Sequence, residues 1–199
     1  MGCLKRLFQL LVWILAIIGF LSLGGDKLLQ EHFGDWIKSS QEKMEERAKA
    51  IIDLSAVSDE YEIDKTANFM GYKGVLAEHK ASGQKFAILQ PKDSQILTKQ
   101  DFATKEVDKK IEELNKKFQY QYVHLENLMI TNRGTIKAIN QSIPYVRFEA
   151  DAVNLPVQGV QGVIAVAQGE DGSNQILIAY AQHKKYSQII TEEFFRKIK

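Results

Sequence analysis

The chain has 199 residues, with 26 basic and 25 acidic side chains and a formal net charge of +1 at pH 7. Nucleic-acid-binding proteins usually concentrate a strong basic excess on one face, so this balance argues against a nucleic-acid partner. A single cysteine, Cys3, excludes a disulfide framework within the chain.

The first element in chain order is an uncharged apolar segment from Leu7 to Gly25. A helix over this segment would be roughly 28 Å long, close to the thickness of the hydrocarbon core of a bilayer. A Lys-Arg pair precedes the segment, and the positive-inside bias places the N-terminus in the cytoplasm and the remainder outside it. Trp13 can reach headgroup depth if this helix shifts or tilts. We therefore expect a single-pass signal anchor in the cell (inner) membrane.

Two other interpretations of this segment compete with the anchor. A cleaved secretory signal would use Ser22-Leu23-Gly24 as its small-x-small site, although the apolar stretch is longer than in such signals. The start Met1-Gly2-Cys3 is typical of eukaryotic acylation, but the myristoylation pattern needs Ser or Thr at the sixth position, where Arg6 stands. The length of the apolar segment favours the uncleaved anchor.

Residues 26–54 show the pattern of an amphipathic helix, with apolar residues on one stripe and charged residues opposite. Three interpretations remain open: the stripe packs on its own domain, lies on the lipid surface, or pairs with a helix of another protein or of a second copy. Residues 55–70 break the pattern with an acidic cluster, which predicts a linker. The candidate interaction stripe consists of Phe33, Trp36, Ile37, Met44 and Ile51.

From residue 71 the pattern changes to that of strands. Two strands flank Ala81-Ser82-Gly83, a short glycine-containing loop that predicts a β-hairpin. Residues 98–118 form the clearest helix, with Thr98 or Asp101 as its N-cap.

Five further strands with short turns follow this helix, and a last helix lies over residues 184–199. The first two of these strands are expected to meet at a turn over Asn132-Arg133-Gly134. Weak alternation in VIAVAQ and QILIAYAQ predicts central strands that are covered on both faces, and a lipid-carrying pocket would have a similar lining.

The predicted fold is therefore α+β, with an N-terminal transmembrane helix and an amphipathic stalk before the domain. The domain has an antiparallel sheet of about six or seven strands in the order ββαβββββα, with helices on one face. The division is a cytoplasmic tip and anchor over 1–25, a stalk and linker over 26–70, and an extracytoplasmic domain over 71–199.

Polar side chains on two of the strands suggest the one candidate for catalysis. Side chains two apart on a strand share a face, which places His124 beside Glu126 and, on YVRFEADAV, Glu149 beside Asp151. A histidine next to a carboxylate can act as a general base or bind a metal. However, a wet sheet face is polar by default, and a catalytic zinc site normally needs three protein ligands. His124, Glu126 and Glu149 are therefore weak catalytic candidates.

The chain carries no phosphate-binding loop, dinucleotide fingerprint or nucleophile elbow, so no cofactor is expected. These observations favour a non-catalytic extracytoplasmic, periplasmic domain that acts as an interaction or accessory module of a bacterial envelope complex. Its expected partners are the lipid bilayer and other membrane or envelope proteins or a second copy. A domain that binds a small apolar or lipid ligand is the alternative, and a metal-dependent or hydrolytic enzyme is the third hypothesis.

Overall fold

The computed structural model describes the chain from residue 41 onward, except for six short internal gaps. No helix in this part of the chain is long and apolar enough to cross a membrane. The expected anchor over residues 7–25 lies outside the described residues, as do Phe33, Trp36 and Ile37. The described residues are 41–69, 72–91, 97–104, 106–118, 124–153, 159–169 and 172–199.

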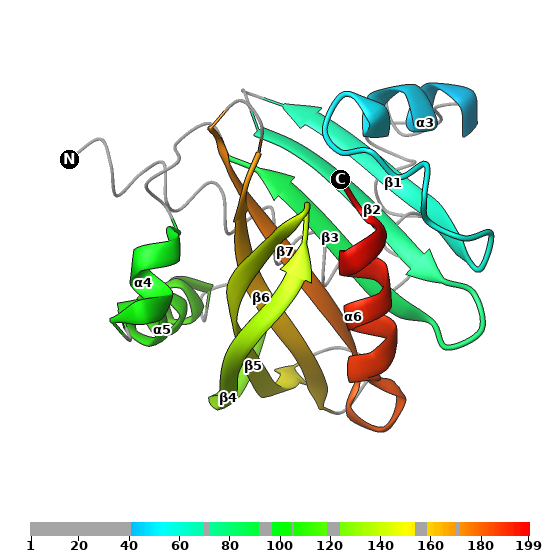
Figure 1. Cartoon of the computed structure of the whole chain (residues 1–199). Helices are drawn as coiled ribbons and strands as arrows, with labels where there is room; N and C mark the ends of the chain where they lie inside the picture. The colour runs from blue at the N-terminus through cyan, green and yellow to red at the C-terminus, as the bar shows by residue number, and fades with distance from the viewer. Residues whose placement is uncertain are drawn as a thin grey trace.

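The fold is α+β with a seven-stranded antiparallel sheet, which confirms the predicted class (Figure 1). The helix expected over residues 98–118 is divided into two helices. The elements in chain order are α3 (Gln41–Lys49), β1 (Tyr61–Phe69), β2 (Tyr72–His79), β3 (Gln84–Gln90), α4 (Lys99–Ala103), α5 (Glu106–Phe118), β4 (His124–Ala138), β5 (Gln141–Val153), β6 (Val160–Gln168), β7 (Asn174–Gln182), the 3-10 helix η1 (His183–Lys185) and α6 (Gln188–Lys197).

The strands lie in the order β1-β2-β3-β7-β6-β5-β4, and every neighbouring pair is antiparallel. Two meanders, β1–β3 and β4–β7, are joined where β3 pairs with β7. The last strand of the chain is thus the middle strand of the sheet. The prediction that VIAVAQ and QILIAYAQ are central is confirmed, because β6 and β7 are buried along nearly their whole length.

Helices cover both faces of the sheet, so the prediction of helices on one face is wrong. Phe102 of α4 and Val107 of α5 pack on one face, together with Ile178 of β7. Phe194 of α6 packs on the other face, together with Leu177 of β7. Strands without polar alternation need apolar cover on both faces, and the two helical layers supply it.

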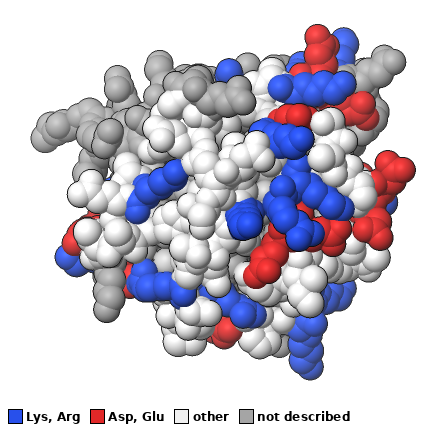
Figure 2. Space-filling model, viewed as in Figure 1, with Lys and Arg blue, Asp and Glu red and all other residues white. Residues whose placement is uncertain are grey.

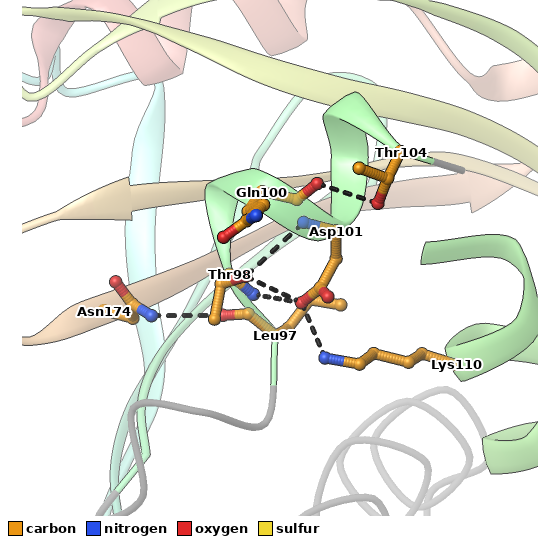
Figure 3. A network of polar contacts seen from close by, with 7 residues as sticks. All are labelled: Leu97, Thr98, Gln100, Asp101, Thr104, Lys110 and Asn174. Atoms are coloured by element: carbon orange, nitrogen blue, oxygen red, sulfur yellow. Dashed lines mark hydrogen bonds and ion pairs between the residues drawn. The ribbon is translucent and has the colours of Figure 1, made fainter. Parts of the chain in front are cut away.

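A polar network ties α4 and α5 to each other and to the sheet (Figure 3). Thr98 and Asp101 form a capping box, in which the Thr98 backbone N–H donates to Asp101 Oδ2 at 2.7 Å. Lys110 Nζ of α5 donates to the same carboxylate oxygen at 2.7 Å. Asn174 Nδ2 of β7 donates to the Leu97 carbonyl at 3.3 Å. The predicted N-cap is confirmed at Thr98.

The sheet begins before residue 71, which is the predicted start of the domain. β1 lies in the segment predicted as a linker and pairs with β2 from Tyr61–His79 to Phe69–Tyr72. Its charged residues obscured the strand pattern, because an edge strand needs apolar side chains only where it touches the core. Tyr61 is buried and Ile63 packs against the same core, as expected for alternate positions on one face.

The turn predicted at Asn132-Arg133-Gly134 is absent, because β4 runs through these residues without a break. The chain reverses instead at Ile139-Asn140, where both residues have positive φ angles of 49° and 54°. Positive φ at both central positions is the geometry of a two-residue type I′ hairpin turn. Gly134 lies within the strand and not in a turn. A glycine fits there because the ring of Tyr145 packs against it. The observed order is therefore βββααββββα.

The hairpin predicted around Ala81-Ser82-Gly83 is confirmed. β2 and β3 pair up to His79 and Gln84, and Gly83 has a φ of +71° in the turn between them. The Gly83 N–H donates to the His79 carbonyl at 2.9 Å and closes the turn.

Candidate interaction site

The predicted catalytic candidates lie on β4 and β5, and the strand register fixes their separation. His124 pairs with Val153, whereas Glu149 pairs with Met129. Val153 is four residues along β5 from Glu149, which is about 13 Å at the rise of a strand. The register therefore does not bring His124 next to Glu149.

The carboxylates near these positions have local partners. Glu126 is exposed and pairs across the strands with Asp151, whose Oδ2 accepts a hydrogen bond from Asn127 Nδ2 at 2.7 Å. Glu149 Oε1 accepts one from Gln161 Nε2 at 2.7 Å. No group of three or more His, Cys, Asp and Glu residues within the described ranges could hold a metal ion.

A concave site lies elsewhere, between α3, the segment that follows it, and the edge of the sheet. Its volume is about 470 Å³, and we call it the α3 cleft. The two ends of the described chain meet here, because residues of α3 and β1 line the cleft together with a residue of α6. The lining residues are Glu45, Ala48, Lys49, Leu54, Ser55, Val57, Ser58, Asp59, Tyr61, Glu62, Ile63, Ala77, Lys80 and Phe194.

The chain around the cleft is held at several points. Ala48 of α3 is 1% exposed, and Ile51 and Ile52 after the helix are buried in the same core as α6. The Asp53 N–H donates to the Lys199 carbonyl at 2.8 Å, and the Lys199 N–H donates back to the Asp53 carbonyl at 3.0 Å. The segment that leads from Asp53 to β1 is therefore held in place at Asp53.

Packed aromatic rings lie beneath the cleft. The Tyr61 ring lies 5.0 Å from that of Phe194 and 5.6 Å from that of Phe86, measured between centroids. Burial raises the pKa of Tyr61 to about 12, and the nearby carboxylates of Glu193 and Glu60 act in the same direction. Tyr61 therefore keeps its proton at neutral pH and contributes a neutral ring and hydroxyl.

The rim of the cleft carries charges of both signs. Glu45 and Asp59 stand on the rim with Lys49 and Lys80, and Lys80 Nζ donates to the Asp59 backbone carbonyl at 2.8 Å. Figure 2 shows the same mixture of basic and acidic side chains around α3 and α6. An apolar floor within a polar rim is the usual anatomy of a protein interface.

The structure places two members of the candidate interaction stripe. Met44 is half-buried and Ile51 is 8% exposed in the core of its own domain. In this part of the stripe the first of the three interpretations applies, since Ile51 packs on the sheet and is not accessible to a partner. No local sequence pattern indicates the α3 cleft, because segments far apart along the chain build it.

The sequence matches no protein-family model, and no curated protein matches it either.

Proposed function

We propose that this chain is a membrane-anchored, non-catalytic interaction module of an envelope complex, and that its extracytoplasmic domain engages a partner through the α3 cleft. The observation that carries this proposal is the cleft itself. Its volume of about 470 Å³ falls within the range of about 300–1,000 Å³ typical of small-molecule pockets, which is also room for side chains of a partner. The cleft also adjoins α3, the first described helix after the apolar N-terminal segment.

Site-specific photocrosslinking in intact membranes tests the proposal. A photoreactive residue replaces Val57, which lines the cleft, and in a matched control it replaces Thr135, an exposed residue of β4. We expect a reproducible adduct, to another protein or to a second copy, from position 57 and not from position 135. The absence of any reproducible adduct at position 57 would count against an interaction role for the cleft.

The anchored topology is tested separately, with a C-terminal tag and protease added outside intact cells or spheroplasts. We expect the full-length product to be digested, as the positive-inside bias requires. A product shortened by about 24 residues would mean a cleaved signal and a released domain. Protection of the full-length chain would refute the proposed orientation.

A small apolar or lipid ligand is the second candidate occupant of the same cleft. The half-buried apolar side chains of Leu54, Val57 and Ile63, which line the cleft, favour it, because ligand sites are mostly apolar with a few polar groups. Native mass spectrometry of the full chain, released from detergent, would reveal a retained ligand as added mass. We expect Val57→Trp to remove that mass by filling the cleft, whereas an unliganded wild-type chain would exclude this alternative.

A further inference from the structure

The α3 cleft, beside the edge strand β1, presents apolar side chains that the rest of the domain covers only in part (Figure 1). Leu54, Val57 and Ile63 line the cleft and pack against the core, yet each is only half-buried. Covering their remaining surface would be favourable, because apolar area removed from water stabilises whatever complex removes it. The cleft therefore favours an occupant with apolar side chains.

The candidate interaction stripe supplies such side chains from the same chain. Where the structure describes this stripe, it packs on its own domain, since Met44 is half-buried and Ile51 lies in the core. Trp36 and Ile37 are the last members of the stripe before α3 begins at Gln41. If the remainder of the stripe also packs on the domain, these two residues are the nearest in sequence to the cleft.

The chain between Ile37 and α3 is long enough to reach the cleft. Glu45 and Lys49 of α3 line the cleft. At 1.5 Å per residue they lie about 6 and 12 Å along the helix from Gln41. An extended chain spans up to about 3.5 Å per residue, so the steps from Gln41 back to Ile37 cover up to about 14 Å. Ile37 therefore reaches the cleft if the chain reverses its direction before α3.

The sequence directly before α3 favours such a reversal. Ser39-Ser40-Gln41-Glu42 has the S-x-x-E spacing of a capping box, which predicts the start of a helix. A chain that enters a helix at its N-cap is not bound to the direction of the helix axis. The residues before Ser39 are therefore free to fold back along α3 instead of extending it.

The charges that flank the apolar pair suit the rim of the cleft. Asp35 and Lys38 stand on either side of Trp36-Ile37, so the segment carries one charge of each sign. The rim also carries both signs, with the acidic residues Glu45, Asp59 and Glu62 and the basic residues Lys49 and Lys80. A segment of mixed charge finds opposite charges on this rim, whereas a strongly acidic or strongly basic segment would also meet like charges.

We infer that Trp36 and Ile37 of this chain occupy the α3 cleft until a partner displaces them. A short tether holds the segment at an effective concentration of the order of millimolar, so only a partner that binds more tightly than the segment replaces it. The inference names a regulation of the same cleft, and it rests on the proposed function only for the competition with a partner. The occupancy itself is measured on the chain alone.

Contact quenching of a bimane label by tryptophan measures the occupancy in the full chain, held in nanodiscs of a neutral lipid. Cys3→Ser and Trp13→Phe leave Trp36 as the single tryptophan. The label is attached through Ala56→Cys, an exposed position beside the lining residue Val57, and in the matched control through Thr135→Cys on β4.

We expect Trp36 to quench about half or more of the fluorescence at position 56, because a tethered occupant fills most of the clefts. Trp36→Phe should restore this fluorescence, since phenylalanine keeps an apolar ring but does not quench bimane. At position 135 the same substitution should change nothing.

Photocrosslinking from position 57 in intact membranes measures the competition. Trp36→Ala with Ile37→Ala should raise the yield of the partner adduct about fivefold, because the apparent affinity of a partner is reduced by the fraction of clefts that are already filled. Met129→Ala removes an exposed apolar side chain of β4 and should leave the yield unchanged.

Equal fluorescence at position 56 before and after Trp36→Phe would overturn the inference, and so would equal quenching at position 135. A labelled chain with Trp36→Phe that is quenched only by added unlabelled chain would make a second copy the occupant, which also overturns it. Quenching as expected, with no adduct from position 57 in any variant, would uphold the occupancy and refute the proposed function. The two failures are therefore distinguishable.

Discussion

Among the glycines whose surroundings the structure describes, Gly162 of β6 has the least room for an added atom. It pairs with Phe148 of β5 and with Tyr180 of β7, so it lies between two strands in the buried part of the sheet. A Cβ at this position would lie 2.8 Å from two atoms of the Phe148 ring and in hard contact with the Ala179 carbonyl oxygen. We therefore predict that Gly162→Ala strongly destabilises the domain.

The size of this destabilisation depends on whether the atoms that the added Cβ would meet can move aside. The Phe148 ring is 3% exposed within a packed core, and the Ala179 carbonyl belongs to the central strand β7. Overpacking of this kind costs about 1–3 kcal/mol per site, and a backbone obstacle puts the value at the upper end. Replacing glycine by alanine returns about 0.4–1 kcal/mol by restricting the unfolded chain. We expect a net loss of about 2–3 kcal/mol in the free energy of unfolding.

Urea unfolding of the full chain, followed by far-ultraviolet circular dichroism, measures this loss as a lower midpoint at an unchanged m value. Gly74→Ala is the matched control, because its Cβ would lie 3.1 Å from the end of the Leu89 side chain and at an ordinary contact distance, 3.6 Å, from the Ile88 carbonyl oxygen. We expect the control to lose less than about 1 kcal/mol, because the Leu89 side chain can shift and no backbone atom is in hard contact. If Gly162→Ala unfolded within about 0.5 kcal/mol of the wild type, the close approach of Phe148 and β7 would be refuted.

Three further predictions concern polar groups. Thr191→Val should lower the free energy of unfolding by about 1–3 kcal/mol in the same urea assay, because the buried Gln84 Nε2 loses its 2.8 Å bond to Thr191 Oγ1; no change would contradict this role. Burial raises the pKa of Asp101, but hydrogen bonds from Lys110 and Thr98 outweigh it and hold the pKa below 3.8. The stability that Asp101→Asn removes should therefore be present at neutral pH and vanish as pH falls below about 4, and a pH-independent difference would be evidence against this charge effect. Burial raises the pKa of Tyr61 and Tyr186 to about 12, so wild-type stability should fall as pH rises from 10 towards 12, and less so in Tyr61→Phe with Tyr186→Phe.

Local sequence patterns predict the structure correctly where it depends on residues that are close together in the chain. The hairpin turn at Gly83, the cap at Thr98 and the buried pair β6–β7 all follow from residues within a few positions of one another. Edge strand β1 was missed because Glu62, Asp64 and their neighbours have the composition of a linker. Such charges, together with the bulge between Ile63 and Lys65, are also how an edge strand avoids unwanted pairing.

The remaining features depend on contacts between distant segments, which no local pattern encodes. Gly134 has the composition of a turn, and only the Tyr145 ring on the paired strand shows why a glycine is needed there. The α3 cleft combines Lys49 and Tyr61 with Phe194, which lies at the other end of the domain sequence. The cover on the second face of the sheet likewise comes from helices separated along the chain.

The central place of β7 has a consequence for the order of events during synthesis. A ribosome makes β1–β3 and β4–β6 before it makes β7, so for some time the nascent chain holds two small sheets that are not yet joined. During that time β3 and β6 each present an unpaired hydrogen-bonding edge, the kind of surface that promotes aggregation. Insertion of β7 closes both edges in one step, and its contacts with β3 span a long stretch of chain, which slows folding. A chain that stalls before residue 174 would therefore retain both of these adhesive edges, and completion of this single strand is the step that removes them.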